Sequence, residues 1–516
     1  MGQIKSIGKP NNNRITKNAT MLTIRMVLAT LVGLYTSRIV FNQLGDINYG
    51  IYGVVGGILG FLGFLTAAMA GATSRFITYE IGTGNADKVK DVFSSSLVIH
   101  ILIAILVIIV GETFGIWFLY NILNIPAERM NAAFWVLQCS IFSSALNVTQ
   151  VPYTAMIMAY EKMNVYAYFE ILNVSLKLVI VYMLMASSFD KLIVYSFLLT
   201  GTSLIMVLVN RIYCIYKFPE SRFSRKLNKG TLISILKYSG LDLYGNICVT
   251  VNNQGLIYAI NIFFSVIYNA AVGLANTING MILGLTTNIA IAFKPQIIKQ
   301  YAAGNIKEMQ TVMQNSLKFT LLAVAIIGVP CFMEATYILN FWLGEVPAYS
   351  VGFLRVIILQ SFLPLIINVC NAAVHANGNI KALSYINGTI FLIMPLFICL
   401  FYWLGFDAFF GYYIEIIGFC VIIINTLYII KRLIPTFYVA GIVKVIGFTG
   451  ISILLSTLIP IIVRNYIEMS FIRVVVVFLL YALTLAAVSY ILVLDKQEKT
   501  ATTRYLLKLI GINHNA

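Results

Sequence analysis

The segment FSSSLVIHILIAILVIIVGETFGIWF, residues 93–118, is long and apolar enough to cross a bilayer as one α-helix. Such a crossing needs about 20 predominantly apolar residues. Fourteen runs of this kind, separated by short polar breaks, fill the chain almost end to end. The composition agrees, because 60% of the 516 residues are hydrophobic and only 10% are charged, against about 25% charged in soluble proteins. The sequence therefore predicts an all-α, polytopic membrane protein.

The fourteen runs set the predicted helices, which are named below by their residue ranges. Their boundaries are 18–42, 48–73, 93–118, 132–158, 165–186, 191–213, 238–262, 268–293, 316–340, 351–376, 382–404, 408–430, 438–463 and 471–494.

The basic residues orient these helices. With the boundaries above, 27 of the 35 Lys and Arg lie in segments on the side of the N-terminus, and 4 lie on the opposite side. Because Lys and Arg concentrate in cytoplasmic loops, both termini are predicted to be cytoplasmic. The net charge of +16 is then a signal of topology. The basic residues are spread over separate loops, which disfavours nucleic-acid binding.

An internal repeat organises the helices into two halves. Residues 47–97 align without a gap to residues 267–317, with 14 of 51 positions identical. Six predicted crossings separate the copies, an even number, so both copies have the same orientation in the membrane. Parallel repeats of this type place the substrate path between the halves. The predicted division is a six-helix bundle at 1–216, a basic linker at 217–237, a second six-helix bundle at 238–430, an extra helix pair at 438–494 and a cytoplasmic tail at 495–516.

Several functions are disfavoured by what the sequence lacks. No G-x-x-x-x-G-K-[ST] motif is present, and the predicted outer loops are too short to form a catalytic domain. The seven cysteines lie in or beside apolar runs without C-x-x-C spacing, so neither disulfides nor a metal site is expected. No covalent chemistry and no cofactor are expected, and the protein is predicted not to be an enzyme.

Motifs at the helix ends indicate a family. The stretches Leu34–Arg38, Gly45–Tyr52 and Gly71–Phe76, with Tyr160–Met163 and the Tyr301–Asn305 loop, resemble oligosaccharide flippases of the Wzx type. These belong to the superfamily that also holds MATE exporters and the lipid II flippase. The resemblance implies the bacterial inner membrane and transport of undecaprenyl-pyrophosphate-linked oligosaccharide units for O-antigen, capsule or exopolysaccharide. It also implies the lipid-linked oligosaccharide, the bilayer and polysaccharide polymerase or assembly proteins as partners.

Four cations inside the predicted helices are candidate cavity residues. They are Arg25, Arg38, Lys177 and Arg355. A charge at the bilayer centre costs roughly 3 kcal/mol or more, so such groups face partners or a wet cavity. For Arg38 and Arg355 the alternative is a side chain that reaches to the headgroups. For Lys177, midway along 165–186, the alternative is an ion pair with another helix. Arginine or lysine in a wet cleft can replace the hydration of a pyrophosphate.

Polar residues elsewhere give a second set of candidates. Asp242, Asn246, Thr250 and Asn253 form one stripe on helix 238–262. The stripe can bind sugar hydroxyls, bond other helices or, through Asp242, carry an ion. Glu112 and Glu334 lie near the outer ends of helices that the repeat pairs. Either can take H⁺ or Na⁺ during coupling, or can be a carboxylate at headgroup level.

The sequence therefore predicts a flippase of lipid-linked oligosaccharides that works by alternating access. One alternative is a MATE-like, cation-coupled exporter of small molecules with the same fold. An alternative of another class is a membrane glycosyltransferase or O-antigen polymerase, which the short outer loops and the repeat disfavour.

Overall fold

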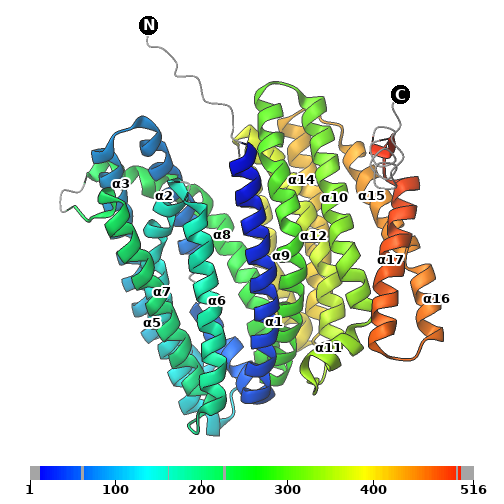
Figure 1. The fold of residues 1–516 in the computed structure, drawn as a ribbon, viewed down its shortest axis with the longest axis horizontal. Helices are drawn as coiled ribbons and strands as arrows, with labels where there is room; N and C mark the ends of the chain where they lie inside the picture. The colour runs from blue at the N-terminus through cyan, green and yellow to red at the C-terminus, as the bar shows by residue number, and fades with distance from the viewer. Residues whose placement is uncertain are drawn as a thin grey trace. The chain divides into compact units, whose positions relative to one another are not determined.

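A computed structural model describes residues 12–59, 63–160, 162–224, 228–379, 381–495 and 498–500. Within these ranges the chain forms helices joined by short connections, and no strand occurs (Figure 1). The side chains of residues 12–31 and of some positions in later helices, including Asp242, lie outside the description. The predicted all-α class is confirmed.

Contacts divide the chain into two compact units. The first consists of residues 1–273 and 391–408, and the second of residues 274–390 and 409–516. Two helices, α9 and α13, contribute residues to both units. The predicted division at 217–237 and the relation between the two repeats stay predictions.

The first unit contains the helices that build the candidate site. Its helices are α1 (Asn12–Gly57), α2 (Gly63–Thr83), α3 (Ala86–Val110), α4 (Ile116–Asn121), α5 (Met130–Ala159), α6 (Met163–Ala186), α7 (Lys191–Lys217), α8 (Lys229–Phe263), the start of α9 (Val266–Ala302) and most of α13 (Gly388–Trp403). A π-helical segment, Gly111–Gly115, joins α3 to α4. Helix α5 packs against α7, α3 and α2, and α1 packs against α6.

The second unit follows the same all-helical plan. It contains the remainder of α9, then α10 (Ile306–Met333), α11 (Ala335–Leu343), α12 (Ser350–Asn377), α14 (Phe410–Leu433), α15 (Val439–Leu455), α16 (Leu458–Tyr466) and α17 (Phe471–Leu492). Its core lies mainly among α10, α12 and α14.

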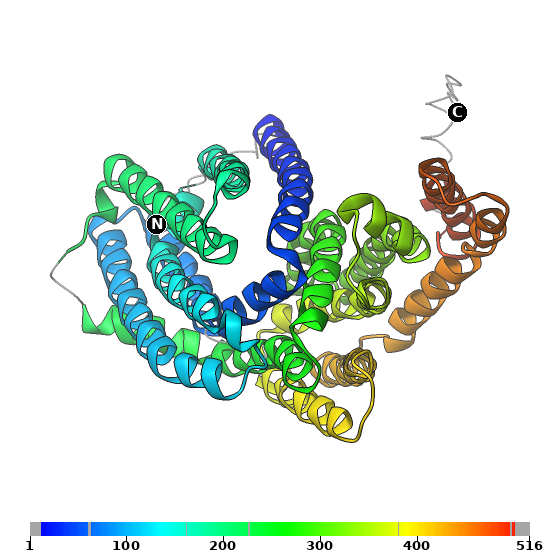
Figure 2. The same ribbon diagram turned by 90° about the horizontal axis from the view of Figure 1, so that it is seen from below.

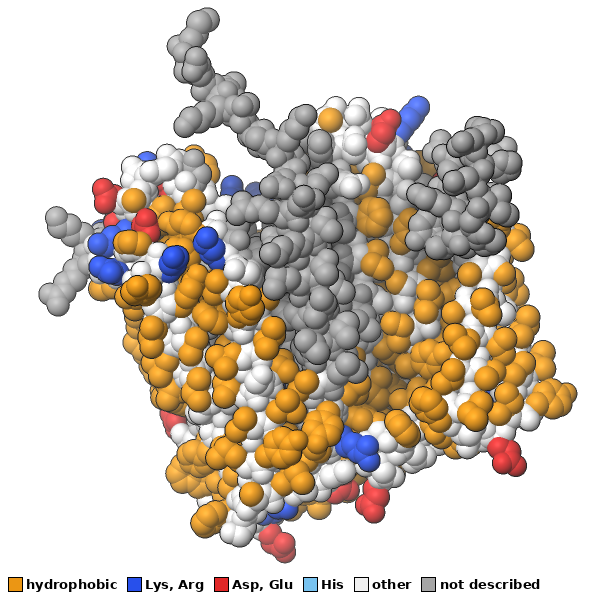
Figure 3. Space-filling view, viewed as in Figure 1, with side chains coloured by type: hydrophobic (Ala, Val, Ile, Leu, Met, Phe, Trp, Pro, Cys, Tyr) orange, Lys and Arg blue, Asp and Glu red, His pale blue; other side chains and the backbone are white. Residues whose placement is uncertain are grey.

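Eleven helical segments in the described part of the chain are long and apolar enough to cross a membrane. Large apolar side chains are exposed along them, for example Leu102 and Ile109 of α3 and Leu479 and Leu483 of α17. Figure 3 shows these hydrophobic side chains over the middle of each unit, with most charged side chains toward the helix ends. This is the surface that a hydrocarbon layer requires.

The structure breaks two of the predicted runs. The run at 316–340 is interrupted at Glu334, and the run at 438–463 is interrupted between α15 and α16. The run at 48–73 falls partly in α1 and partly in α2, and residues 60–62 between them lie outside the description. Helix α9 extends to Ala302, and helix α10 begins at Ile306. Most of the polar segment between the predicted runs 268–293 and 316–340 is therefore helical. Hydropathy detects the apolar length of a helix, so it misses both interruptions and polar extensions.

Two glycines shape the first unit at the start of the second predicted crossing. Gly45 has φ 75°, and at this residue α1 changes direction. Gly50 lies against α9, where a Cβ atom would stand 2.1 Å from the carbonyl oxygen of Val266. Glycine is therefore required at 50 for this close approach of two backbones.

Polar contacts attach the last helices to α10 within the second unit. Gln310 donates to the carbonyl of Tyr438 at 2.6 Å and accepts from its amide at 3.1 Å. Lys318, which is 4% exposed, donates to both carboxylate oxygens of Glu498 at 2.7 Å. In Figure 2, α15–α17 stand at one edge of this unit in orange and red. The start of the extra helix pair, at Tyr438, and the tail residue Glu498 are thus both joined to α10.

Candidate functional site: two polar cavities in the first unit

Two cavities lie among the helices of the first unit. The larger, of about 340 Å³, is lined by residues of α1, α5, α6 and α7, including seven Ser and Thr side chains, and is here called the hydroxyl cavity. The smaller, of about 240 Å³, is lined by α1, α6 and α7 and contains Tyr49, Tyr52 and Tyr195; it is called the tyrosine cavity. Tyr52, Lys177 and Leu199 line both, so the cavities meet at these residues.

Lys177 is the only charged residue that lines either cavity in the described part of the chain. It lies near the middle of α6, and its side chain is exposed. No hydrogen bond or ion pair joins it to another described residue. A cation so placed in a membrane-spanning helix requires water or an anion, because an unpaired charge in hydrocarbon is costly.

Hydroxyl groups cover the wall of the larger cavity. Ser143 of α5 donates to the hydroxyl of Thr200 on α7 at 3.0 Å, which joins the two helices. Thr200 in turn is within donor distance of the Cys139 and Ser196 carbonyls, at 3.2 and 2.9 Å. Serine and threonine in helices commonly bond the carbonyl four residues earlier. These bonds fix the wall while leaving hydroxyl oxygens toward the cavity.

The tyrosine cavity has a different lining. The rings of Tyr52 and Tyr195 pack edge to face, with centroids 5.0 Å apart. Thr36 and Ser37 of α1 line the same space, and their hydroxyls donate to the carbonyl of Gly33 at 3.1 and 2.6 Å. A tyrosine offers an apolar ring and a polar hydroxyl, so this cavity suits a ligand with both kinds of surface.

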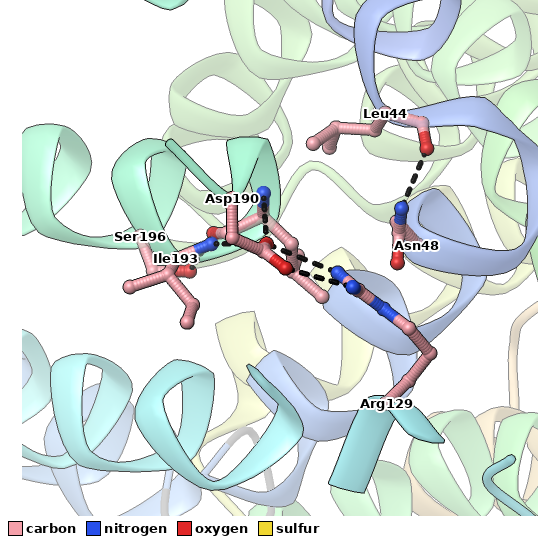
Figure 4. A network of polar contacts seen from close by, with 7 residues as sticks. Leu44, Asn48, Arg129, Asp190, Ile193 and Ser196 are labelled. Carbon is pink, nitrogen blue, oxygen red and sulfur yellow. Dashed lines mark hydrogen bonds and ion pairs between the residues drawn. The ribbon is translucent and has the colours of Figure 1, made fainter. Parts of the chain in front are cut away.

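An ion pair joins the chain segments that precede α5 and α7. Arg129 donates to both carboxylate oxygens of Asp190, at 2.7 and 3.0 Å (Figure 4). These bonds hold the pKa of Asp190 below its ordinary value of 3.8, against partial burial, which raises it. Asp190 also caps α7 by accepting from the amide of Leu192 at 3.0 Å. Ser196, one turn and a half further along α7, lines the hydroxyl cavity.

The other predicted cations have different surroundings. Arg38 is exposed on α1, and Arg25 lies on the same helix where side chains are outside the description. Arg355 of the second unit donates to the carbonyl of Phe332 at 3.3 Å, and its guanidinium lies 5.8 Å from the centre of that ring. Of the predicted site residues with described side chains, Lys177 alone lines the two cavities.

The predicted stripe on helix 238–262 lies on α8. Asn246 and Thr250 are partly buried and Asn253 is exposed, while the side chain of Asp242 lies outside the description. None of the three described side chains lines the hydroxyl or the tyrosine cavity. The described side chains of the stripe therefore do not share either cavity with Lys177.

Glu112 and Glu334, paired by the repeat, differ sharply in their contacts. Glu112 is exposed and accepts from Gln138 at 3.2 Å. Glu334 is 0% exposed and is bound by Arg464 at 2.9 Å and by Arg473 at 2.5 Å. The two arginines come from α16 and α17, so Glu334 links these helices to the end of α10. No group of three or more His, Cys, Asp or Glu residues suited to a metal ion occurs among the described residues.

Several cavity residues were not singled out in the sequence, among them Ser140, Ser144, Asn173 and Tyr195. One signal was available, since Asn173 precedes Lys177 by four residues and so shares its helix face. The serines of α5 carried no such signal, because serine in an apolar helix usually bonds its own backbone.

Membrane-length helices and polar cavities within a helical unit define a polytopic membrane transporter. The sequence matches the MatE family over residues 22–183 and 243–400, which is more than half of the chain. The protein belongs to this family.

Solved structures share the fold. The lipid II flippase MurJ in an inward closed conformation is similar with a TM-score of 0.69 at 14% identity, over 91% of this chain and 98% of that one. An inward-facing multidrug resistance MATE transporter of the MOP superfamily gives 0.63 at 16% identity, over 82% and 100%. A MOP superfamily transporter from Pyrococcus furiosus Vc1 (DSM3638), described by a binding pocket of reverse polarity, gives 0.59 at 15%, over 81% and 95%. No curated protein matches the sequence. The fold is that of MOP superfamily transporters.

Proposed function

We propose that the protein is a flippase that moves undecaprenyl-pyrophosphate-linked oligosaccharide units across the bacterial inner membrane. The observation that carries this proposal is Lys177, a cation without a protein partner among the described residues, at the junction of two polar cavities. An anionic headgroup gains from such a charge as it leaves bulk water. Arg25, Arg38 and Arg355 are proposed to add positive charge along the path, and the polar stripe of α8 to contact sugar hydroxyls.

The charge of the cavities favours this function over the export of cationic drugs. A cationic cargo needs carboxylates in the binding space, and the described residues that line the hydroxyl and tyrosine cavities include none. The fold itself is neutral between the two, because lipid flippases and drug exporters both share it. The positive charge of Lys177, the one charged side chain in the described lining of these cavities, therefore favours a flippase of anionic lipids over a drug exporter.

The remaining features of the transport cycle follow from the proposal. The two repeat halves alternate access, with both termini in the cytoplasm, and the delivered unit passes to a polymerase or other polysaccharide assembly proteins. Coupling to H⁺ or Na⁺ through Asp242 or Glu112 is part of the proposal. Glu334 is a weaker candidate for coupling, because two arginines already neutralise its carboxylate.

The test is complementation of a flippase-null bacterial host, with surface polysaccharide measured at matched protein levels. Lys177→Gln should lower surface polysaccharide at least about tenfold and cause lipid-linked intermediate to accumulate, since a charge-assisted contact is worth about 1.5–3 kcal/mol. Lys177→Arg should retain more activity than Lys177→Gln, because it keeps the charge. Arg25→Lys should likewise outperform Arg25→Ala.

Two results would contradict the proposal. One is a wild-type protein that fails to restore polysaccharide in every host with a lipid-linked pathway. The other is full restoration by the Arg25→Ala, Lys177→Gln double variant, which would leave these cations without a role in binding the cargo.

A further inference from the structure

We infer that Ser140 and Ser144 of α5 and Asn173 and Lys177 of α6 form a phosphate clamp inside the hydroxyl cavity. This inference rests on the proposed function for the identity of the cargo, and it names the chemical group that the cavity grips. All four residues line that cavity. The ligand class is a phosphoryl or diphosphoryl group attached to a lipid.

The spacing of the four residues places their polar groups on facing helix surfaces. Asn173 and Lys177 are four residues apart on α6, and Ser140 and Ser144 are four residues apart on α5. Residues at this spacing share a helix face, separated by about 6 Å along the axis. Because both pairs line one cavity, each of the two helices presents two hydrogen-bonding residues to the same space.

The clamp residues have donors that the protein does not use. Within the described part of the chain, no hydrogen bond engages the side chains of Ser140, Ser144, Asn173 or Lys177. Neighbouring Ser143 differs, because its hydroxyl already donates to Thr200. A serine supplies one donor, an asparagine amide two and a lysine ammonium three.

This surplus of donors selects the ligand. The described lining contains a cation and several unused donors but no carboxylate, so it favours a ligand that carries negative charge and mainly accepts hydrogen bonds. A phosphoryl group does so through several oxygens and carries the charge that matches Lys177. A neutral sugar presents donors and acceptors together, so it would leave the ammonium without an anion.

Two glycines of α1 leave space for the clamp residues and their ligand. Gly53 and Gly56 of α1 line the same cavity, and a Cβ atom at Gly56 would lie 3.8 Å from the hydroxyl of Ser140. A Cβ atom at Gly53 would meet no atom within 4 Å. A side chain at 53 therefore starts in open space and extends into the space the clamp needs, and it replaces a helix-interior glycine.

The experiment measures binding of geranylgeranyl pyrophosphate to the purified full-length protein in phosphatidylcholine nanodiscs. The Ser140→Ala, Ser144→Ala double variant should weaken binding about tenfold or more, because two hydrogen bonds to a charged group are lost. The matched control is Ser175→Ala, which lies between Asn173 and Lys177 on α6 but lines neither cavity; its hydroxyl donates to the carbonyl of Ile171 at 2.9 Å, and the change should alter affinity less than about twofold. Gly53→Leu should weaken binding while leaving the unfolding temperature unchanged or higher.

Competition identifies the source of the phosphate. Inorganic pyrophosphate should displace the probe, and replacing phosphatidylcholine by phosphatidylglycerol should not. Displacement by phosphatidylglycerol would assign the clamp to bulk lipid headgroups and overturn its assignment to the cargo.

The outcome for the clamp is separate from the outcome for the proposed function. Unchanged affinity in the serine double variant, or an equal loss in Ser175→Ala, overturns the clamp even when the wild-type protein restores polysaccharide. A wild-type protein that binds the probe through these serines but restores no polysaccharide leaves the clamp in place and removes the oligosaccharide cargo.

Discussion

Lys177 in the first unit lies within a candidate membrane span and Glu334 in the second lies at the end of one, but the surroundings of these two charges are opposite. Glu334 is fully buried and held by Arg464 and Arg473, whereas Lys177 is exposed to two cavities and has no protein partner among the described residues. A charge inside the bilayer needs compensation. A charge that the protein itself neutralises with an oppositely charged side chain is structural, whereas a charge without a protein partner indicates a ligand site.

The largest expected effect is on stability and comes from removing the buried carboxylate of Glu334. Glu334→Ala leaves Arg473, which is 7% exposed, without its carboxylate. Removing one partner of a buried ion pair typically costs about 3–5 kcal/mol, so the free energy of unfolding should fall by that order. Thermal or denaturant unfolding of purified protein measures it.

Glu112→Ala is the matched control for this variant. Its carboxylate is exposed and accepts a single bond from Gln138, so the change should remain within about 0.5 kcal/mol. Equal losses in the two variants would show that the arginine contacts do not stabilise the second unit.

A smaller effect is expected at the partly buried ion pair between Arg129 and Asp190. Because the folded pKa of Asp190 is below its ordinary value of 3.8, the pair stabilises the fold above about that pH, and the contribution is lost as the pH falls through the lower folded pKa. Arg129→Gln should therefore cost about 0.2–1 kcal/mol at pH 7 and progressively less below pH 4.

Asp190→Asn provides the control for the pH dependence. Asparagine can still cap α7, so the helix start is retained while the titrating group is removed. In the Asp190→Asn background, the cost of Arg129→Gln should therefore not vary with pH. A cost in Arg129→Gln that stays constant from pH 7 to pH 3 would contradict the assignment.

Much of the fold was predictable because hydropathy reports membrane crossings directly. The predicted run 132–158 corresponds to α5 at Met130–Ala159, and 351–376 to α12 at Ser350–Asn377. The interruptions were not predictable in the same way. The break after α10 falls at Glu334, whose two arginine partners lie more than 100 residues later in the chain, and no local pattern reports such a contact.

The charged residue of the candidate site was predictable from the sequence, but the polar residues that line the cavities were not. Lys177 stood out because a cation midway along an apolar helix has few explanations other than a partner or a cavity. The serines of α5 and Tyr195 of α7 did not, since their role depends on which face of each helix borders the space. Arg355 was predicted as a cavity residue from its charge, but its contact with Phe332 is visible only in the folded chain.

The most direct test of the central claim is the unfolding temperature of Lys177→Gln, measured on the same preparations that are assayed for transport. A ligand-binding charge without a protein partner contributes nothing to the stability of the empty protein. The account therefore predicts an unfolding temperature equal to or above that of the wild type, together with a loss of transport of about tenfold or more. A lowered unfolding temperature, or full transport, would show that Lys177 is a structural charge like Glu334 and would contradict the account.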